Sequence, residues 1–205
     1  MIFPSKKYKS IDEFYHDYVS VLNNSLKQVD SNSIVKVSNL ILKALKKNNR
    51  IFICGNGGSA AIANHFVADY GKYIKTDNNL KPKIVSLSSN IELITAISND
   101  INFDKIFSYQ LENLMQKNDL LVSVSSSGNS KNILDAIKMC NKKGGISISF
   151  LGFGGGKAKK ISNYSLIFDM KNYGLSEDSA HIFMHVICQF LKQKISSLKI
   201  KNIIF

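Results

Sequence analysis

The sequence predicts an α/β fold: a single domain with a five-stranded parallel sheet, helices on both faces of the sheet, and two further helices at the N-terminus. From residue 50 onward, short apolar segments alternate with helical patterns, as expected of strand–helix–strand units. The apolar segments are hydrophobic throughout rather than at alternate positions, which is typical of parallel strands covered on both faces. The chain has 205 residues, 44% of them hydrophobic, and can therefore bury one core.

A helical segment precedes the first strand. Apolar side chains recur at helical spacing over 11–29 and again over 33–47, so each of these helices has one hydrophobic face. The second helix is expected to end at Asn48. We expect this N-terminal segment, residues 1–49, to pack on the α/β part, residues 50–205, so that the two form one structural unit.

The remaining elements follow from the alternation of patterns along the chain. The expected strands are 50–54, 83–87, 119–124, 146–151 and 164–168. The expected helices are 59–73, 90–97, 103–116, 129–142 and 176–198. In an open parallel sheet, ligands bind beyond the carboxyl ends of the strands, where the strand order reverses. The loops that follow the strands are therefore the candidate binding sites.

The net charge of +12 comes almost entirely from lysine, because Arg50 is the only arginine. Proteins that read nucleic acids usually use arginine for forked contacts with bases and phosphates, and they gather basic residues on one face. The lysines here are scattered along the chain. Nucleic-acid binding is therefore not favoured, and a mild attraction for anionic metabolites is the better interpretation of the charge.

The cysteines and the hydrophobic segments indicate a cytoplasmic location. Cys54, Cys140 and Cys188 are odd in number, lie in apolar runs and are too far apart for a metal cluster, so we expect buried, reduced thiols. No apolar stretch reaches the roughly 20 residues needed to span a bilayer. The N-terminus also lacks the continuous apolar core of a signal peptide. We expect no membrane partner.

The segment from Asp119 to Ser130, DLLVSVSSSGNS, predicts a site for a small anion. An apolar strand leads directly into serines and a glycine, and a helical pattern follows. The serine hydroxyls belong to Ser125, Ser126, Ser127 and Ser130. Free backbone N–H groups and partial positive charge at the start of the helix would add to these hydroxyls, so a phosphate is the expected ligand.

A glycine-rich loop, CGNGGSAA from Cys54 to Ala61, follows the first strand. Gly57 and Gly58 permit a close approach of the backbone to a ligand, and Asn56 offers an amide. The loop does not fit a dinucleotide site, because the second strand ends in serine and leucine without the acidic residue that would bind a ribose. Two interpretations stay open: contact with a ligand, or a glycine turn needed only for tight strand–helix packing.

Three of the four histidines share a helix face with a carboxylate. His65 and Asp69 are four residues apart on one expected helix, and Glu177, His181 and His185 repeat that spacing on the last one. Imidazoles and carboxylates are ligands for zinc and other divalent ions. The same groups could act as general acid and base on a sugar carbon. They could also be no more than a surface His–Asp pair and a partly buried histidine pair.

Three segments together resemble the sugar isomerase (SIS) domain family, and within it the phosphoheptose isomerases. They are GNGGSAAIANHF, SNDINFDKIF and SSSGNS. The resemblance runs from the N-terminal helices to about residue 195. It implies conversion of sedoheptulose 7-phosphate to D-glycero-D-manno-heptose 7-phosphate, a heptose precursor of bacterial surface polysaccharide. It also implies a homotetramer with active sites between subunits, which often hold zinc.

The resemblance assigns roles position by position. The residues implied to bind the substrate are Asn56, Gly57, Gly58, Asn99, Asp100, Ser125, Ser126, Ser127, Ser130 and Glu177, with the four serines holding the phosphate. The implied metal ligands are His65, Asp69, Glu177 and His185. Asp69 would also be the base that moves a proton between C1 and C2, and His185 its partner acid and base.

The chain departs from the family pattern at its chemical centre. Asp69 stands where glutamate is usual, so its reach is shorter by about 1 Å, and a misplacement of that size can lower a rate greatly. Glu177 stands where glutamine is usual and adds a negative charge. His181 has no usual counterpart, and either rearranges the site or is a core residue. The sugar could therefore differ from the heptose.

A non-catalytic role is the alternative. Some members of the family bind a phosphosugar or another protein, including one type that binds a replication initiator. Their phosphate loop persists while the catalytic carboxylates are lost. Retention of Asp69, Glu177 and His185 argues for the isomerase.

Overall fold

Five parallel strands form the central sheet of the computed structural model, which describes residues 2–75 and 79–203. The strands are β1 (Arg50–Gly55), β2 (Lys83–Ser86), β3 (Leu120–Ser125), β4 (Ile146–Leu151) and β5 (Tyr164–Ile167). Their order across the sheet is β2-β1-β3-β4-β5, and every neighbouring pair is parallel. The predicted fold class and the five predicted strands are confirmed, with ends that differ by at most one residue.

The strand order reverses between β1 and β3, which are neighbours at the centre of the sheet. The chain leaves β1 toward β2 on one side, and later leaves β3 toward β4 on the other. Gly55 at the end of β1 pairs in register with Val124, so the loops that follow these two strands start side by side. This reversal is the place where ligands bind in open parallel sheets.

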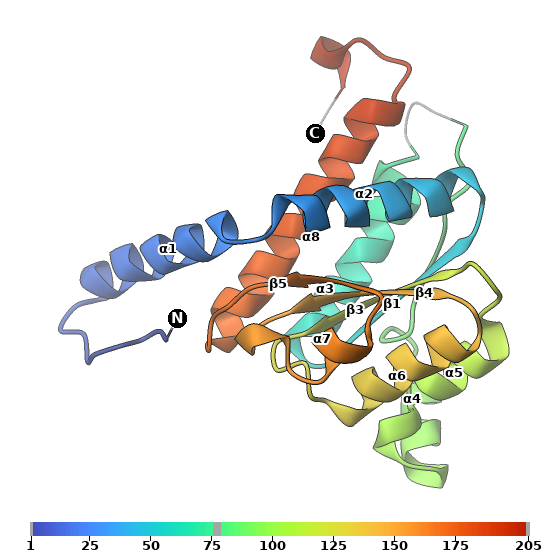
Figure 1. Ribbon diagram of the computed structural model, residues 1–205, viewed down its shortest axis with the longest axis horizontal. Helices are drawn as coiled ribbons and strands as arrows, with labels where there is room; N and C mark the ends of the chain where they lie inside the picture. Colours follow the sequence, from blue (N-terminus) through green and yellow to red (C-terminus); the bar gives the residue numbers. More distant parts are fainter. Residues whose placement is uncertain (1, 76–78, 204–205) are drawn as a thin grey trace.

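Helices cover both faces of the sheet (Figure 1). The helices are α1 (Ile11–Lys27), α2 (Ser31–Lys46), α3 (Gly58–Ala68), α4 (Ile91–Asp100), α5 (Ser108–Leu114), α6 (Lys131–Lys142), α7 (Ala158–Ile161) and α8 (Tyr173–Ile195). One core lies between the sheet and α2, α3 and α8, and the other between the sheet and α4 to α7. Burial of these two apolar layers is the main force that holds the sheet and its helices together.

The N-terminal helices begin where the sequence offers a capping side chain. Ser10 accepts a hydrogen bond from Glu13 N before α1, and Asp30 accepts one from Ser33 N before α2. The buried face of α2 packs on β5, α8 and β1, whereas α1 projects past the sheet and contacts the start of α8 (Figure 1). The division of the chain at residue 49 stays a prediction.

Two predicted helices divide into separate elements in the structure. The pattern over 59–73 becomes α3 followed by a π-helical turn, Asp69–Tyr73, in which Ile74 N donates to Asp69 O. The pattern over 103–116 divides into a short 3-10 turn, Phe103–Lys105, and α5. Hydrophobic spacing does not distinguish these tighter or wider turns from a regular helix.

The last helix begins three residues before the predicted start, because Asn172 caps it: its side-chain oxygen accepts a hydrogen bond from Leu175 N at 2.9 Å. It also ends at Ile195, three residues short of the predicted end. Helix α7 was not predicted, since four residues are too few to show a helical period.

Cys54, Cys140 and Cys188 are buried and form no disulfide, as predicted. Burial, and to a lesser degree the nearby Asp69 carboxylate, raise the pKa of the Cys188 thiol to about 12. Within the described residues, no helix combines the length and hydrophobicity that crossing a bilayer requires.

Candidate functional site

A cavity of about 270 Å³ opens at the carboxyl ends of β1 and β3, at the reversal of strand order. Its lining residues are Asn56, Gly57, Ser59, Val124, Ser125, Ser126, Ser127, Ser130, Tyr173 and Glu177. The glycine loop, the serine loop and the start of α8 therefore meet at one place. The lining is mostly hydroxyl, amide and backbone groups, which suits a small, polar ligand.

The serine loop is organised around its own hydroxyl groups. Ser125 Oγ accepts a hydrogen bond from Gly128 N at 3.1 Å, and Ser127 Oγ accepts one from Asn129 N at 3.2 Å. Ser130 is the N-cap residue of α6, but its side chain makes no capping hydrogen bond. Ile133 N already donates to Asn132 Oδ1. The Ser130 hydroxyl and the N–H groups at the very start of α6 are the ones that point to an anion site.

A second glycine-rich segment, residues 152–156, packs against the serine loop. Gly128 has φ +62°, and a Cβ atom at that position would lie 2.2 Å from Gly155 O. The Asn129 side chain accepts a hydrogen bond from Lys157 N at 3.0 Å. Sequence reasoning missed this contact, although the run of three glycines before Lys157 was a signal that two backbones approach closely.

The glycine loop is joined to the serine loop by two asparagines. Asn56 Nδ2 donates to Asn132 Oδ1, and Asn132 Nδ2 donates to Asn56 Oδ1, both at 2.9 Å. Asn132 is buried in the first turn of α6. This pair fixes the orientation of the Asn56 amide, which was predicted as a sugar contact. Sequence reasoning missed Asn132, because an asparagine early in a helix carries no distinctive signal.

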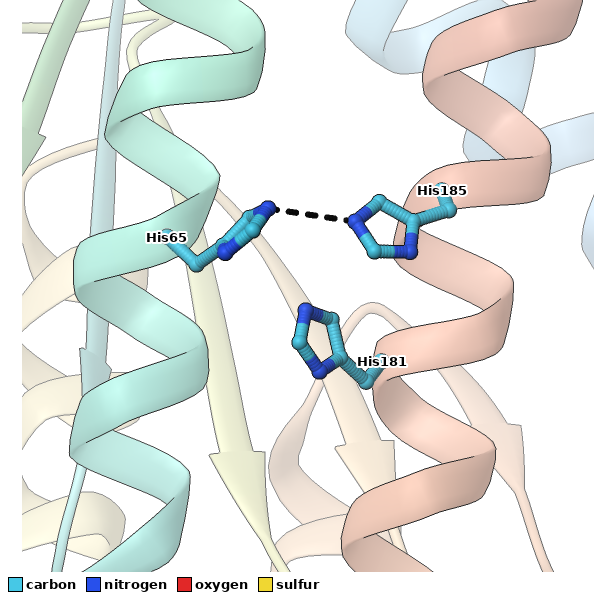
Figure 2. A group of neighbouring side chains, drawn as sticks. All are labelled: His65, His181 and His185. Carbon is cyan, nitrogen blue, oxygen red and sulfur yellow. Dashed lines mark hydrogen bonds between the residues drawn. The ribbon is translucent and has the colours of Figure 1, made fainter.

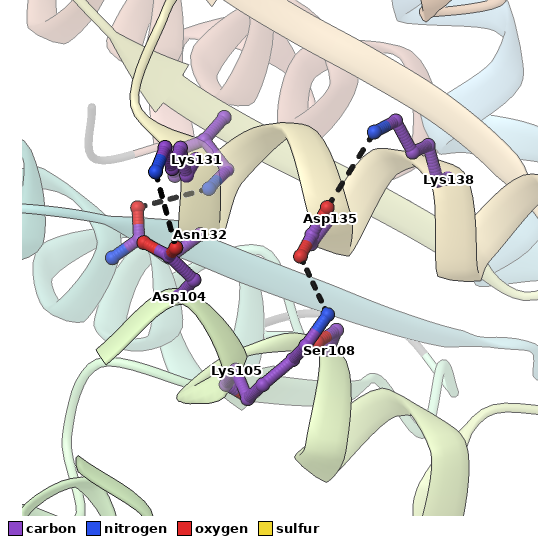
Figure 3. A network of polar contacts seen from close by, with 8 residues as sticks. Asp104, Lys105, Ser108, Lys131, Asn132, Asp135 and Lys138 are labelled. Carbon is purple, nitrogen blue, oxygen red and sulfur yellow. Dashed lines mark hydrogen bonds and ion pairs between the residues drawn. The ribbon is translucent and has the colours of Figure 1, made fainter. Parts of the chain in front are cut away.

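Charged side chains attach the 3-10 turn Phe103–Lys105 to α6, close to Asn132 (Figure 3). Lys105 Nζ lies 2.7 Å from Asp135 Oδ2, and Lys131 Nζ lies 3.8 Å from Asp104 Oδ2. Exposed ion pairs of this kind contribute little stability, typically about 0–1 kcal/mol. Their part here is to orient the turn against α6.

Glu177 forms the wall of the cavity opposite the serine loop. Its carboxylate accepts hydrogen bonds from the backbone and the side chain of Ser59, so it caps the start of α3. A Cβ atom on Gly58 would lie 2.2 Å from Glu177 Oε2, so a side chain there would displace the carboxylate. Burial raises the pKa of Glu177, the neighbouring Asp178 raises it further, and the hydrogen bonds from Ser59 partly offset both.

A cluster of imidazoles lies between α3 and α8, which run side by side (Figure 2). His65 Nε2 is 3.2 Å from His185 Nε2. One ring nitrogen from each of His65, His181 and His185 lies within 4.8 Å of the other two. These three side chains could together hold a metal ion. The histidine of the predicted His65–Asp69 pair and the predicted pair of histidines on α8 thus lie in one group.

Asp69 reaches both of the flanking imidazoles. Its Oδ1 lies 3.4 Å from His65 Nε2, and its Oδ2 lies 3.3 Å from His185 Nε2. The residue stands at the junction of α3 and the π-helical turn, a kind of turn that is common at functional sites. The shorter side chain therefore does not keep the carboxylate from the histidines, which was the concern raised by the sequence.

His181 is partly buried between the same two helices. Burial lowers the pKa of its imidazole, and the nearby His185 and His65 lower it further. The ring is therefore held neutral near pH 7. A neutral imidazole is a metal ligand or a hydrogen-bonding group rather than a charge.

Two predicted substrate contacts lie elsewhere. Asn99 and Asp100 are exposed at the end of α4, where Asn99 Nδ2 donates to Asp100 Oδ1 at 2.9 Å, and neither residue lines the cavity. The structure thus brings together the glycine loop, the serine loop and Glu177, and separately the histidine group with Asp69. On α8, His181 and His185 follow Glu177 by about 6 and 12 Å along the helix axis.

Comparisons with known proteins agree with this fold. Residues 13–152 match the family model described as SIS domain. The phosphoheptose isomerase of Aliarcobacter butzleri (strain RM4018) is 36% identical, over 78% of this chain and 85% of that protein. The phosphoheptose isomerase of Campylobacter concisus (strain 13826) is 40% identical, over 73% of this chain and 79% of that protein.

Solved structures give the same result. The structure of phosphoheptose isomerase GmhA from Neisseria gonorrhoeae superposes with a TM-score of 0.81 at 27% identity, covering 89% of this chain and 97% of that one. The chain therefore belongs to the SIS domain family, and within that family to the phosphoheptose isomerase group.

Proposed function

We propose that this protein is a phosphoheptose isomerase that converts sedoheptulose 7-phosphate to D-glycero-D-manno-heptose 7-phosphate for the synthesis of bacterial surface polysaccharide. One observation carries the proposal. The Asp69 carboxylate lies beside two imidazoles at the end of α3, and the start of the same helix borders the serine-lined cavity. An aldose–ketose isomerase needs both parts: a grip on the phosphate and a base near the carbonyl carbon.

The serine loop is proposed to bind the phosphate. The hydroxyls of Ser125, Ser126, Ser127 and Ser130 line the cavity at the start of α6. Backbone N–H groups and the positive end of the helix add to them. Asn56, Gly57 and Glu177 border the remaining space and would contact the sugar hydroxyls. Gly58, also predicted as a contact, does not line the cavity and lies against the Glu177 carboxylate. Binding the phosphate at a fixed place sets the distance of the other end of the sugar from the histidine group.

Asp69 and His185 are proposed to move the protons. Asp69 would take a proton from C1 of the ketose, and the electrons of that C–H bond would form the C1–C2 double bond of an enediolate. The carbonyl oxygen on C2 then carries the negative charge. His185 would carry the proton of the C1 hydroxyl to that oxygen, and Asp69, after its carboxyl proton has exchanged with solvent, would give a proton to C2. The product is the aldose, with no net gain or loss of atoms.

Zinc is the proposed metal of the site. His65, Asp69 and His185 present their ligand atoms within 3.4 Å of one another, and neutral imidazoles with a carboxylate are a suitable donor set for zinc. A bound divalent ion would supply positive charge that stabilises negative charge on a sugar oxygen. Glu177, the fourth ligand implied by the resemblance, is hydrogen-bonded to Ser59.

The phosphate assignment predicts a specific effect of Ser130→Ala. Loss of the hydroxyl is expected to raise KM for the sugar phosphate by about tenfold or more, the scale of a hydrogen bond to a charged group. Stability should hardly change, because the Ser130 side chain makes no capping bond. Steady-state kinetics and urea unfolding measure the two effects.

Ser10→Ala is the matched control. Ser10 does cap its helix, and its loss should cost about 0.5–2 kcal/mol of stability without a change in KM. An unchanged KM in Ser130→Ala would remove Ser130 from the phosphate site.

The protein is proposed to form a homotetramer. An apolar hollow of about 400 Å³ lies between α2 and α8, and exposed hydrophobic side chains border it. They include Val35, Val186 and Phe190, which are 59%, 49% and 51% exposed. Exposed apolar patches on this scale mark protein–protein contacts. Assembly would also allow Asn99 and Asp100 to contribute to the site of a neighbouring subunit.

Phe190→Asp is expected to shift the assembly toward smaller species, because it places a charge in the apolar contact. Size-exclusion chromatography with light scattering measures the mass. Tyr109→Asp, on α5, is the control: Tyr109 is 41% exposed and lies away from the hollow. An unchanged mass for Phe190→Asp would exclude this surface from the assembly.

The reaction is proposed to take place in the cytoplasm, where three buried thiols without disulfides are expected. The direct test of function is turnover of sedoheptulose 7-phosphate by the purified, metal-loaded protein, followed by NMR. Unphosphorylated sedoheptulose is the matched control and should react far more slowly, because it offers nothing to the serine loop. Equal rates on both sugars would contradict the proposed role of the phosphate.

A further inference from the structure

His181 has no assigned part in the site, and its surroundings are unusual. Within the part of the chain that the structure describes, its Nε2 is buried and has no hydrogen-bond partner. A buried polar atom without a partner costs free energy, so a ring nitrogen in this position calls for a ligand. The nearest groups are not apolar: the ring centroid of His181 lies 4.8 Å from that of His65 and 4.6 Å from that of His185.

The three imidazoles are close enough to share one ion. One ring nitrogen from each lies within 4.8 Å of the other two, and Figure 2 shows the rings gathered between α3 and α8. His181 and His185 are one turn apart on α8, and His65 faces them from α3. Metal sites on helices are commonly built from histidines at this spacing with a third ligand from another element.

Glu177 is engaged elsewhere. It lies one further turn before His181, and its carboxylate accepts two hydrogen bonds from Ser59 while packing on Gly58. Moving the carboxylate to the histidine group would break both hydrogen bonds and leave the start of α3 uncapped. Within the described chain, the group of potential ligands contains His181 and not Glu177.

We propose that His181 is a metal ligand, and that it completes a three-imidazole zinc site with His65 and His185 in place of Glu177. The inference deepens the proposed function, on which it rests for the identity of the site. Three neutral ligands do not reduce the net positive charge of the zinc site. Three protein ligands are also the number that catalytic zinc sites use. With three imidazoles on the ion, Asp69 is not needed as a ligand and stays beside the ion as the base, while Glu177 remains in the cavity wall.

Zinc binding by the full-length protein, freed of metal by a chelator, tests the inference without any substrate. Affinity is measured by competition with a chromophoric chelator, and ligand number by the visible spectrum of bound Co²⁺. His181→Gln should weaken zinc binding by more than the roughly 10- to 100-fold effect of removing an outer hydrogen-bond partner, and should change the Co²⁺ spectrum. Glu177→Gln should leave both unchanged.

Two further variants complete the design. His181→Asn, compared with His181→Gln by circular dichroism and thermal melting, shows that the loss of binding does not come from misfolding. His16→Gln is the matched control, because His16 is an exposed histidine on α1 that pairs with Asp12. It should bind zinc like the parent protein.

The inference is overturned if His181→Gln binds zinc like the parent, if Glu177→Gln loses binding instead, or if the parent binds no zinc. Turnover is measured separately, so the two proposals can fail independently. A parent protein that isomerises the sugar but binds no zinc would leave the proposed function standing. A protein that binds zinc through His181 and shows no turnover would support the inference and contradict the function.

Discussion

Asp69→Asn is expected to lower kcat by about 10²- to 10⁴-fold, the usual contribution of a general base. The carboxamide has nearly the same shape but cannot take a proton from C1. The two imidazoles that hold the carboxylate at 3.3 and 3.4 Å would remain in place. KM should change much less than kcat, since the phosphate is bound elsewhere. Steady-state kinetics on sedoheptulose 7-phosphate measure both constants.

The control for this substitution is Asp12→Asn. Asp12 also pairs with a histidine four residues away in its helix, but it is exposed on α1 and far from the cavity. Its replacement should leave kcat and KM unchanged. If Asp69→Asn keeps the parent's kcat in a protein shown to be an isomerase, Asp69 is not the base.

Gly128→Ala is expected to disrupt the phosphate loop more than a methyl group added at any other position in the loop. The residue has φ +62°, which costs a non-glycine residue about 1–3 kcal/mol. The added Cβ would also lie 2.2 Å from Gly155 O, so one of the two loops must move. Because Gly128 N is bonded to Ser125 Oγ, that movement would displace the serine hydroxyls. We expect lower stability in urea unfolding and a large rise in KM.

Gly154→Ala separates the cost of a positive φ from the steric clash between the two loops. Gly154 also has a positive φ, +76°, but the nearest atom to an added Cβ is Asp169 Oδ1 at 3.6 Å. Only the conformational cost should appear, as a loss of about 1–3 kcal/mol with little change in KM. Equal KM values in the two variants would show that the contact between Gly128 and Gly155 does not shape the phosphate site.

The fold was predictable because each strand is apolar along its whole length and leads into a polar loop. β3 is buried at every position, so its sequence carries a strong signal for a parallel strand covered on both faces. The serine loop and the glycine loop were predictable for a similar reason: both follow strands that flank the reversal of strand order. Short-range pattern and local chemistry were enough for these features.

Long-range contacts decided what the sequence could not predict. The union of His65 with His181 and His185 depends on α3 and α8 lying side by side, and no spacing within one segment reveals it. For His65 and His185 only the resemblance to a known family implied it, and for His181 nothing did. The second support of the serine loop, through Gly155, and the Asn56–Asn132 pair also join distant segments.

The role of Glu177 as a helix cap was missed for a different reason. A carboxylate that caps a helix usually lies next to that helix in the sequence, whereas Glu177 caps α3 from α8. Asn99 and Asp100, which the family resemblance implies to contact the sugar, do not line the cavity of this chain.

The most direct test of the central claim is the reaction in deuterated water. The account holds that Asp69 moves a proton between C1 and C2 of a sugar whose phosphate is held by the serine loop. The aldose formed from sedoheptulose 7-phosphate should then carry deuterium at C2, detected by NMR and mass spectrometry. A metal-loaded, folded protein that binds the sugar phosphate but forms no labelled aldose would contradict the account and favour a non-catalytic binding module.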